Sequence, residues 1–159
     1  MFFEFTQNNS GGSFQVDDKI CHRLIIEADS EREATWKAEE LGVYFNGCEN
    51  GQDCPCCGDR WYGCNELVFP LKYSSFGKST AEEFSKKYNA EIFKVEFEKG
   101  KKPWIDYKTK EPSEYGIIFS SPENYGQYLA DEYGWTLPDV RIFYKEGDVI
   151  EITGKVLQK

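Results

Sequence analysis

Histidine is nearly absent from this chain, which has one, His22, in 159 residues. Most acid–base schemes need an imidazole and a partner group, and the common catalytic zinc sites of enzymes use two or three histidines. The sequence also lacks a nucleophile elbow and the Walker and Rossmann glycine patterns, and its carboxylates are scattered along the chain. We therefore expect a binding protein without catalytic residues.

Long apolar runs are missing as well. No apolar stretch approaches the length that spans a membrane. The opening MFFEFTQNNSGG lacks the basic region and the apolar core of a secretory signal. These absences predict a protein of the reducing cytoplasm that binds no membrane. Disulfide frameworks are rare in that compartment.

Positive charge is scarce: 19 Lys and Arg stand against 28 Asp and Glu, for a net charge of −9. Attraction to a phosphate backbone is driven by an excess of Lys and Arg, so direct binding to a nucleic-acid backbone is not expected. A small anionic ligand needs only a local cluster of donors. Aromatic residues make up 16% of the chain, and they either line a pocket for a planar ring or fill the core.

Cysteine, by contrast, is concentrated, with five of the six cysteines inside residues 47–64. The segment Cys54-Pro55-Cys56-Cys57-Gly58 fits the pattern C-P-x-C-G, in which two thiolates three positions apart can bind one metal ion. Pro55 restricts φ and Gly58 tolerates a positive φ, so the backbone can turn back on itself. This pattern predicts a zinc knuckle with Cys54 and Cys57 as ligands.

A structural zinc site takes four ligands. Cys48 and Cys64 are the nearest completing pair in the sequence, His22 is a distant alternative, and Cys56 is left over in either scheme. Other interpretations stay open. The cysteines can be reduced and buried, they can form disulfides, or one of them can be a nucleophile activated by His22. A catalytic zinc is less favoured, because a second histidine is missing.

The polar stretch QNNSGGS at residues 7–13 interrupts the first apolar strand. Every residue in it is polar or glycine, which is typical of a turn or loop. Its backbone N–H groups and amide side chains could form a nest that holds an anion or the edge of a base. The alternative is a plain hairpin connection without a ligand. A P-loop is not expected, because the lysine and hydroxyl residue that should follow are missing.

The spacing of apolar residues predicts an α+β fold with a mostly antiparallel sheet, three helices and the Cys-rich loop. Residues 1–65 are expected to form a β-β-α-β lobe that ends in the knuckle. Its strands are expected at 2–5, 20–28 and 43–45. Its helix is predicted to be capped by Ser30 with Glu33 and to end at Gly42.

Residues 66–159 are expected to form a second α+β lobe, or to continue the same domain. Strands are predicted at 67–73 and 117–119, with hairpins over 92–107 and 140–152. The first of these hairpins would turn at the lysine-rich residues 99–102. Two helices are predicted, one capped by Thr80 and one beginning at Pro122 and ending at Gly134.

Three segments together carry a resemblance: QNNSGGSF, IIEADSEREATWKAEELGVYFNG and DCPCCGDRW. Their combination resembles a family of small, largely uncharacterised proteins of tailed bacteriophages, over residues 2–62. The resemblance implies a phage accessory protein made in the host bacterial cytoplasm, without an assigned enzyme activity. It does not cover residues 66–159.

For such a protein we expect stoichiometric binding of a nucleotide-derived host immune signal, without turnover. A guanidinium beside an indole could hold a phosphate and stack a base, and the polar loop would add N–H donors. The expected ligand-binding residues are Asn8, Asn9, Ser10, Gly12, Arg60 and Trp61. An alternative is an acidic protein that blocks a host defence protein by imitating nucleic acid, since the net charge is negative. A structural or assembly factor, including a homo-oligomer, is a third interpretation.

Overall fold

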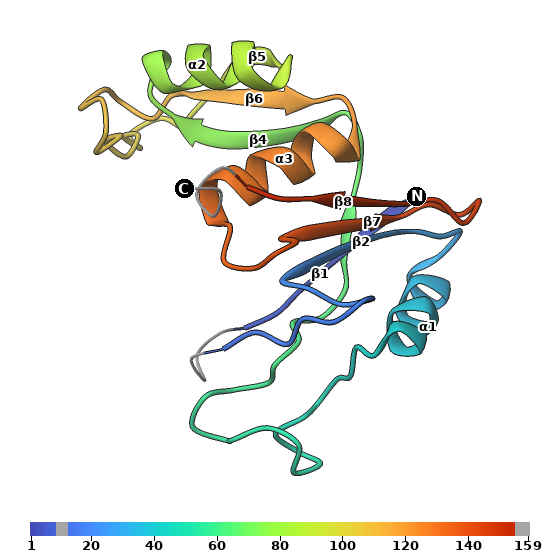
Figure 1. The fold of residues 1–159 in the computed structure, drawn as a ribbon. Helices are drawn as coiled ribbons and strands as arrows, with labels where there is room; N and C mark the ends of the chain where they lie inside the picture. The colour runs from blue at the N-terminus through green and yellow to red at the C-terminus, as the bar shows by residue number, and fades with distance from the viewer. Residues whose placement is uncertain (9–12, 155–159) are drawn as a thin grey trace. The chain divides into compact units, whose positions relative to one another are not determined.

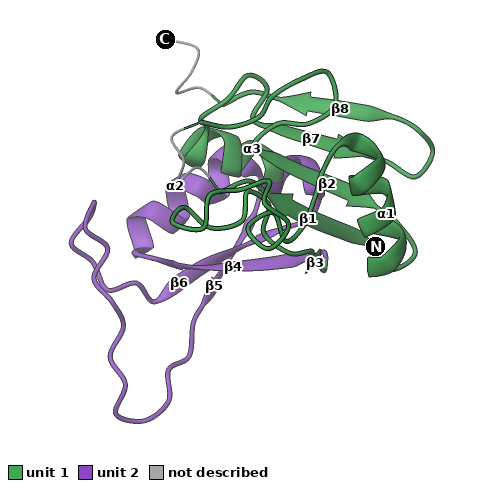
Figure 2. Ribbon diagram, turned by 90° about the horizontal axis from the view of Figure 1, so that it is seen from below, with its two compact units in different colours: residues 1–68, 126–159 green, residues 69–125 purple. Residues whose placement is uncertain are grey.

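The structure is a computed structural model that describes residues 1–8 and 13–154. The chain divides into two compact units (Figure 2). Unit 1 consists of residues 1–68 and 126–159, and unit 2 consists of residues 69–125. Helix α3, Pro122–Tyr133, runs across this division. Among the described residues, every helix is too short or too polar to cross a membrane.

Unit 1 contains a five-stranded sheet in the order β3-β1-β2-β7-β8 (Figure 1). Its strands are β1 Phe2–Thr6, β2 Arg23–Glu27, β3 Asn65–Leu67, β7 Val140–Phe143 and β8 Val149–Ile152. Neighbouring strands are antiparallel except β2 and β7, which pair in parallel with Ile25 opposite Ile142. The centre of the sheet therefore joins segments from the two ends of the chain.

Helix α1, Glu31–Leu41, begins and ends as its sequence predicts. The Ser30 hydroxyl accepts a hydrogen bond from the N–H of Glu33 at 3.1 Å. The Glu33 carboxylate accepts one from the N–H of Asp29 at 3.0 Å, one residue earlier than in an ideal capping box. Gly42 ends the helix with φ 118°. These bonds satisfy backbone groups that a helix end leaves without partners.

The core of unit 1 lies between α1 and the sheet. Phe3 and Phe5 on β1 stand opposite Ile26 and Leu24 on β2, so the four side chains share one face. Burying each of these side chains stabilises the unit by about 1.5–3 kcal/mol. Further buried members are Ile20, Cys21, Ala28, Ala34, Ala38, Val43 and Trp61.

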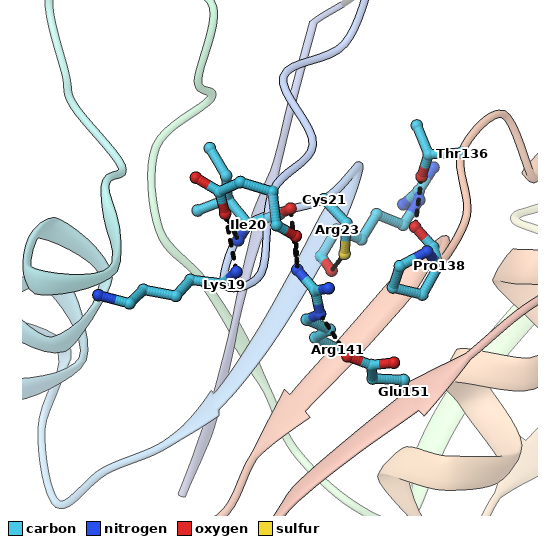
Figure 3. A network of polar contacts seen from close by, with 9 residues as sticks. Lys19, Ile20, Cys21, Arg23, Thr136, Pro138, Arg141 and Glu151 are labelled. Carbon is cyan, nitrogen blue, oxygen red and sulfur yellow. Dashed lines mark hydrogen bonds and ion pairs between the residues drawn. The ribbon is translucent and has the colours of Figure 1, made fainter.

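Arg141 on β7 fastens the segment before β2 to the sheet (Figure 3). Its guanidinium is buried and donates to the carbonyls of Asp17 at 2.7 Å and Ile20 at 3.0 Å. Its Nε donates to the carboxylate of Glu151 at 3.1 Å. A buried guanidinium needs such partners, because an unpaired charge costs several kcal/mol away from water.

Unit 2 is a three-stranded antiparallel sheet in the order β4-β6-β5, with helix α2 against it. Its elements are β4 Leu71–Phe76, α2 Lys78–Tyr88, β5 Glu91–Lys94 and β6 Tyr115–Phe119. Aromatic rings fill the space between helix and sheet. Phe84 on α2 packs against Phe76 with 5.2 Å between ring centroids, and Tyr88 packs against Phe119 at 6.3 Å.

The described residues confirm the α+β class, with three helices and a mostly antiparallel arrangement of strands. Several expected elements differ in detail. Residues 43–45 form no strand, and the third strand of this region, β3, follows the Cys-rich loop instead of preceding it. The strand expected at 67–73 is broken at Pro70, which has no N–H for a sheet ladder. Helix α2 begins at Lys78 with Gly77 as its cap, earlier than the Thr80 cap predicts.

Long-range pairing accounts for the remaining differences. Residues 92–107 do not form a hairpin, because β5 pairs with β6 and the lysine-rich residues lie in the long connection between them. Residues 126–154 belong to unit 1, in which β7 pairs with β2.

Candidate metal centre

The Cys-rich loop, residues 47–64, connects α1 to β3 and is tied to the end of β1. The N–H of Tyr62 donates to the carbonyl of Thr6 at 3.0 Å, and the N–H of Asn8 donates to the carbonyl of Arg60 at 2.6 Å. Gln7 and Trp61 form the bridge between these bonds. The end of the loop therefore continues the antiparallel pairing of β1, which holds the loop beside the N-terminal segment.

Two aspartates fold the loop onto itself. Asp53 accepts hydrogen bonds from the Tyr44 hydroxyl at 2.7 Å and from the N–H of Arg60 at 2.9 Å. Asp59 accepts one from the N–H of Cys48 at 2.9 Å. A Cβ atom on Gly47 would lie 1.8 Å from an oxygen of Asp53, so this close approach requires glycine. Both carboxylates thus have structural partners within the loop.

Three thiols gather at the tip of this loop. The sulfur atoms of Cys54, Cys56 and Cys57 all lie within 4.8 Å of one another. The Sγ atoms of Cys54 and Cys56 are 2.6 Å apart, and those of Cys56 and Cys57 are 3.7 Å apart. The N–H of Cys57 donates to the carbonyl of Cys54 at 3.1 Å, and Gly58 follows with φ 83°. The turn expected from C-P-x-C-G is therefore formed, and Cys56 belongs to the cluster.

The two other predicted ligands lie outside this group of three. The Sγ of Cys48 is 3.5 Å from the carbonyl oxygen of Cys54, next to the cluster. Cys64 is half-buried and packs against the core of unit 1. Burial raises the pKa of its thiol to about 11, and the nearby carboxylates of Glu31 and Glu66 act in the same direction.

His22, the distant alternative, is buried and packs at a tilt against Phe14, with 4.3 Å between ring centroids. It is not a member of the cluster of cysteines. Burial, assisted by the positive charge of Arg23, lowers the pKa of His22 to about 4. The imidazole is therefore neutral at neutral pH.

Hydrogen bonding within the cluster shifts the pKa values of Cys54 and Cys56 in opposite directions. The bond from the Cys56 thiol stabilises a thiolate on Cys54 and lowers the pKa of Cys54. The same bond, together with the neighbouring Cys57, raises the pKa of Cys56 to about 11. Burial and the nearby Asp59 raise the pKa of Cys48. A metal cation that replaces these protons would remove the repulsion between the thiolates, so metal binding and proton release are linked.

Two of the six predicted ligand-binding residues, Asn8 and Arg60, meet the thiols at one small cavity of about 140 Å³. Its lining residues are Asn8, Gln52, Asp53, Cys54, Cys57, Gly58 and Arg60. The Asn8 amide donates to the carbonyls of Cys57 at 2.9 Å and Asp59 at 3.1 Å. The Arg60 guanidinium donates to the carbonyl of Ser13 at 3.0 Å and, at 3.4 Å, to the side chain of Gln7.

The remaining predicted ligand-binding residues are placed differently. The side chain of Trp61 is 2% exposed and belongs to the core, so it presents no open face for a base. Asn9, Ser10 and Gly12 lie outside the described residues. The structure thus brings together Asn8 and Arg60, which are 52 positions apart in the sequence.

Sequence comparison bears on the whole of this region. The family model of a domain of unknown function, DUF7296, matches residues 1–122. The chain belongs to the DUF7296 family. The match includes β1, the Cys-rich loop and all of the unit 2 sheet, and so extends well beyond residues 2–62. No curated protein and no solved structure matches the chain. DUF7296 is an uncharacterised family, and membership assigns no chemistry to the thiols.

Two residues of this region escape sequence reasoning. The spacing of the cysteines leaves Cys56 without a partner, although residues i and i+2 can converge when a tight turn surrounds them, and the run CPCC carries that signal. Gln7 is 2% exposed, and its amide bonds to the carbonyls of Gln15 at 2.6 Å and Cys21 at 2.7 Å. No sequence signal separates Gln7 from the polar residues that follow it.

Proposed function

We propose that this DUF7296 protein is a metal-binding protein that holds one zinc ion through Cys54, Cys56 and Cys57. The convergence of their three sulfur atoms within 4.8 Å carries the proposal. In a tetrahedral zinc site with Zn–S bonds of about 2.3 Å, neighbouring sulfurs are roughly 3.8 Å apart. The 3.7 Å between Cys56 and Cys57 fits this spacing. The sulfurs of Cys54 and Cys56, 2.6 Å apart, would separate when both bind the ion.

Cys48 supplies the fourth ligand in this proposal. Its sulfur lies 3.5 Å from the carbonyl oxygen of Cys54. The charge of Cys54 contributes to the raised pKa of the Cys48 thiol. Cys64 packs against the core and would have to leave it to reach the cluster. Four thiolates leave no open position for substrate, so the role of the ion is structural. It would fix the loop between α1 and β3, and its binding free energy would add to the stability of unit 1.

Metal analysis of the reduced protein tests this proposal. We expect one zinc per chain in the wild type, and loss of zinc in Cys56→Ser and Cys48→Ser. Cys64→Ser is the matched control, because this cysteine lies close in sequence but packs on the core, and it should retain zinc. Cobalt substitution should give the visible spectrum of tetrahedral thiolate coordination. Absence of stoichiometric metal, or zinc retained by Cys56→Ser and lost by Cys64→Ser, would contradict the ligand set.

We also propose a second binding function, sequestration of a phosphate-bearing, nucleotide-derived molecule without turnover. Arg60 lines the small cavity, and its Nε is buried without a hydrogen-bond partner among the described residues. A buried donor of this kind favours an anion. The cavity of about 140 Å³ is smaller than the roughly 300–1,000 Å³ of pockets for drug-sized ligands. A phosphate group or one ring would enter it, while the rest of the ligand stays outside.

The phage resemblance gives this second function its setting. In an infected bacterium, the ligand would be a host immune signal, and the protein would act against host defence from the bacterial cytoplasm. Calorimetry against cyclic dinucleotides and ADP-ribose derivatives tests the binding. Chromatography of ligand released by denaturation tests whether it is chemically unchanged. Release of an altered nucleotide would identify an enzyme, and absence of binding would favour the acidic inhibitor of a host protein.

A further inference from the structure

The connection between β5 and β6, residues 95–114, holds five lysines and five acidic residues, and the lysines cluster in its middle. Residues 99–110, the basic loop, contain five lysines and one aspartate, which gives a local charge of +4 in a chain of −9. The loop also carries two of the most exposed aromatic side chains, Trp104 at 82% and Tyr107 at 84%. Figure 2 draws this connection as a long purple excursion from the end of the unit 2 sheet. Net charge alone does not describe such a surface.

Two acidic groups of this region bind backbone N–H groups at the start of α2, whereas Glu98, next to the loop, is exposed. Asp106 accepts hydrogen bonds from the N–H of Gly77 at 2.9 Å and of Lys108 at 3.0 Å. Glu111 accepts one from the N–H of Ser79 at 3.2 Å. Both carboxylates therefore lie at the N-terminus of α2, where the partial positive charge of the helix stabilises them. The side chains of Lys101, Lys108, Trp104 and Tyr107 are exposed.

The loop has a defined shape that presents these rings. The N–H of Ser113 donates to the carbonyl of Trp104 at 2.7 Å, and Ile105 bridges to Pro112. The N–H of Lys110 donates to the carbonyl of Asp106 at 2.6 Å, which closes the turn between them. These bonds use the backbone only. The side chains of Trp104 and Tyr107 remain available for contact with a ligand.

The lysines are weakly engaged. Lys101 pairs with Glu98 at 3.2 Å and Lys108 with Glu83 at 4.0 Å, and all four side chains are exposed. Exposed ion pairs contribute little to stability, so a phosphate can replace these partners. The ammonium of Lys110 lies 5.6 Å from the centroid of the Tyr107 ring, which places a cation beside the stacking face.

We propose that the basic loop binds single-stranded nucleic acid, with Trp104 and Tyr107 stacking on bases and the lysines contacting phosphates. Exposed aromatic side chains among cations are the combination that non-specific single-strand binders use. An unpaired strand is favoured over a duplex, because a duplex hides the faces of its bases. A membrane surface is less favoured, since Ile105, 49% exposed, is the only aliphatic side chain of the loop between its lysines.

Fluorescence anisotropy of the full-length protein with a labelled oligothymidylate of about 20 nucleotides tests the proposal. We expect binding at about 50 mM salt that weakens steeply by about 200 mM. Trp104→Ala and, independently, Tyr107→Ala should each weaken binding by about tenfold. Lys102→Ala should reduce the slope of log affinity against log salt by about 0.7. A duplex of the same length should bind more weakly than the single strand.

Two matched controls separate the loop from the rest of the surface. Trp36→Ala removes an aromatic side chain of α1 that is 57% exposed, and Lys86→Ala removes an exposed lysine of α2. Both should bind like the wild type. Absence of oligothymidylate binding by the wild type would overturn the proposal, as would equal losses in Trp36→Ala and Trp104→Ala. Binding to phosphatidylglycerol vesicles without binding to oligothymidylate would identify a membrane surface and also overturn it.

Discussion

The side-chain amide of Asn8 donates a hydrogen bond to the backbone carbonyl of Cys57 at 2.9 Å. This bond, and a second from the same amide to Asp59, tie the end of β1 to the turn that carries the three thiols. Asn8, a predicted ligand-binding residue, thus connects the end of β1 to the proposed metal site.

Asn8→Ala should therefore weaken the Cys-rich loop. Each lost hydrogen bond contributes about 1 kcal/mol, so we expect unfolding free energy to fall by about 1–2 kcal/mol and zinc to exchange faster. Urea denaturation and competition with a chromophoric chelator measure the two effects. Asn65→Ala, an exposed substitution on edge strand β3, is the control. Equal zinc exchange in Asn8→Ala and wild type would argue against the positioning of the thiols by Asn8.

Gly47→Ala should destabilise the loop by steric overlap. A Cβ there would lie 1.8 Å from the Asp53 carboxylate, which must then move away from the Tyr44 hydroxyl and the N–H of Arg60. Overpacking of this kind costs about 1–3 kcal/mol. Gly63→Ala is the matched control in the same loop, because a Cβ at Gly63 meets no atom within 4 Å. Thermal denaturation should show a lower Tm for Gly47→Ala alone; equal Tm values for both variants would contradict this prediction.

Removal of the metal should lower the thermal stability of unit 1, because a structural metal stabilises the folded state. We expect a chelator, or Cys57→Ser, to lower the Tm of unit 1 by several degrees, since about 1 kcal/mol corresponds to roughly 2–4 °C in a chain of this size. Differential scanning calorimetry with and without added zinc measures the shift. Zinc should restore the Tm of the chelated wild type and leave that of Cys57→Ser unchanged. A Tm insensitive to chelation would refute a structural metal.

His22 should make stability depend on pH. Its pKa is about 4 in the folded protein, against 6.5 for an unperturbed histidine, so the unfolded chain binds the proton more tightly. The free energy of unfolding therefore falls as pH drops from about 6.5 to 4, and the total loss is about 3 kcal/mol. Above pH 6.5 this loss vanishes.

His22→Phe, which keeps a ring against Phe14, should lack this component. Urea denaturation at pH 7 and pH 4, with chelator present in every sample, compares the pH dependence of variant and wild type. The loss of stability between the two pH values should be smaller in His22→Phe. Identical losses would show that His22 titrates normally in the folded protein.

Local patterns in the sequence were sufficient for several helix ends and for the cysteine turn, although the predicted Thr80 cap of α2 and the strand at 43–45 did not form. The Ser30 cap, the Gly42 stop, the helix from Pro122 and the turn after Cys54 form as predicted, because each depends on hydrogen bonds or dihedral angles within a few residues. The fold class follows from the same local periodicities.

Tertiary structure decided where the cysteines lie and which strands β7 and β8 join. Cys56 joins the cluster and Cys64 packs on the core because of how the loop is folded by Asp53 and Asp59, which spacing does not reveal. The parallel pairing of β2 with β7 brings together residues more than a hundred positions apart, and it returns the C-terminal segment to unit 1. Such pairings depend on the burial of whole strand faces. That burial is a property of the assembled sheet, and the sequence of a short segment does not determine it.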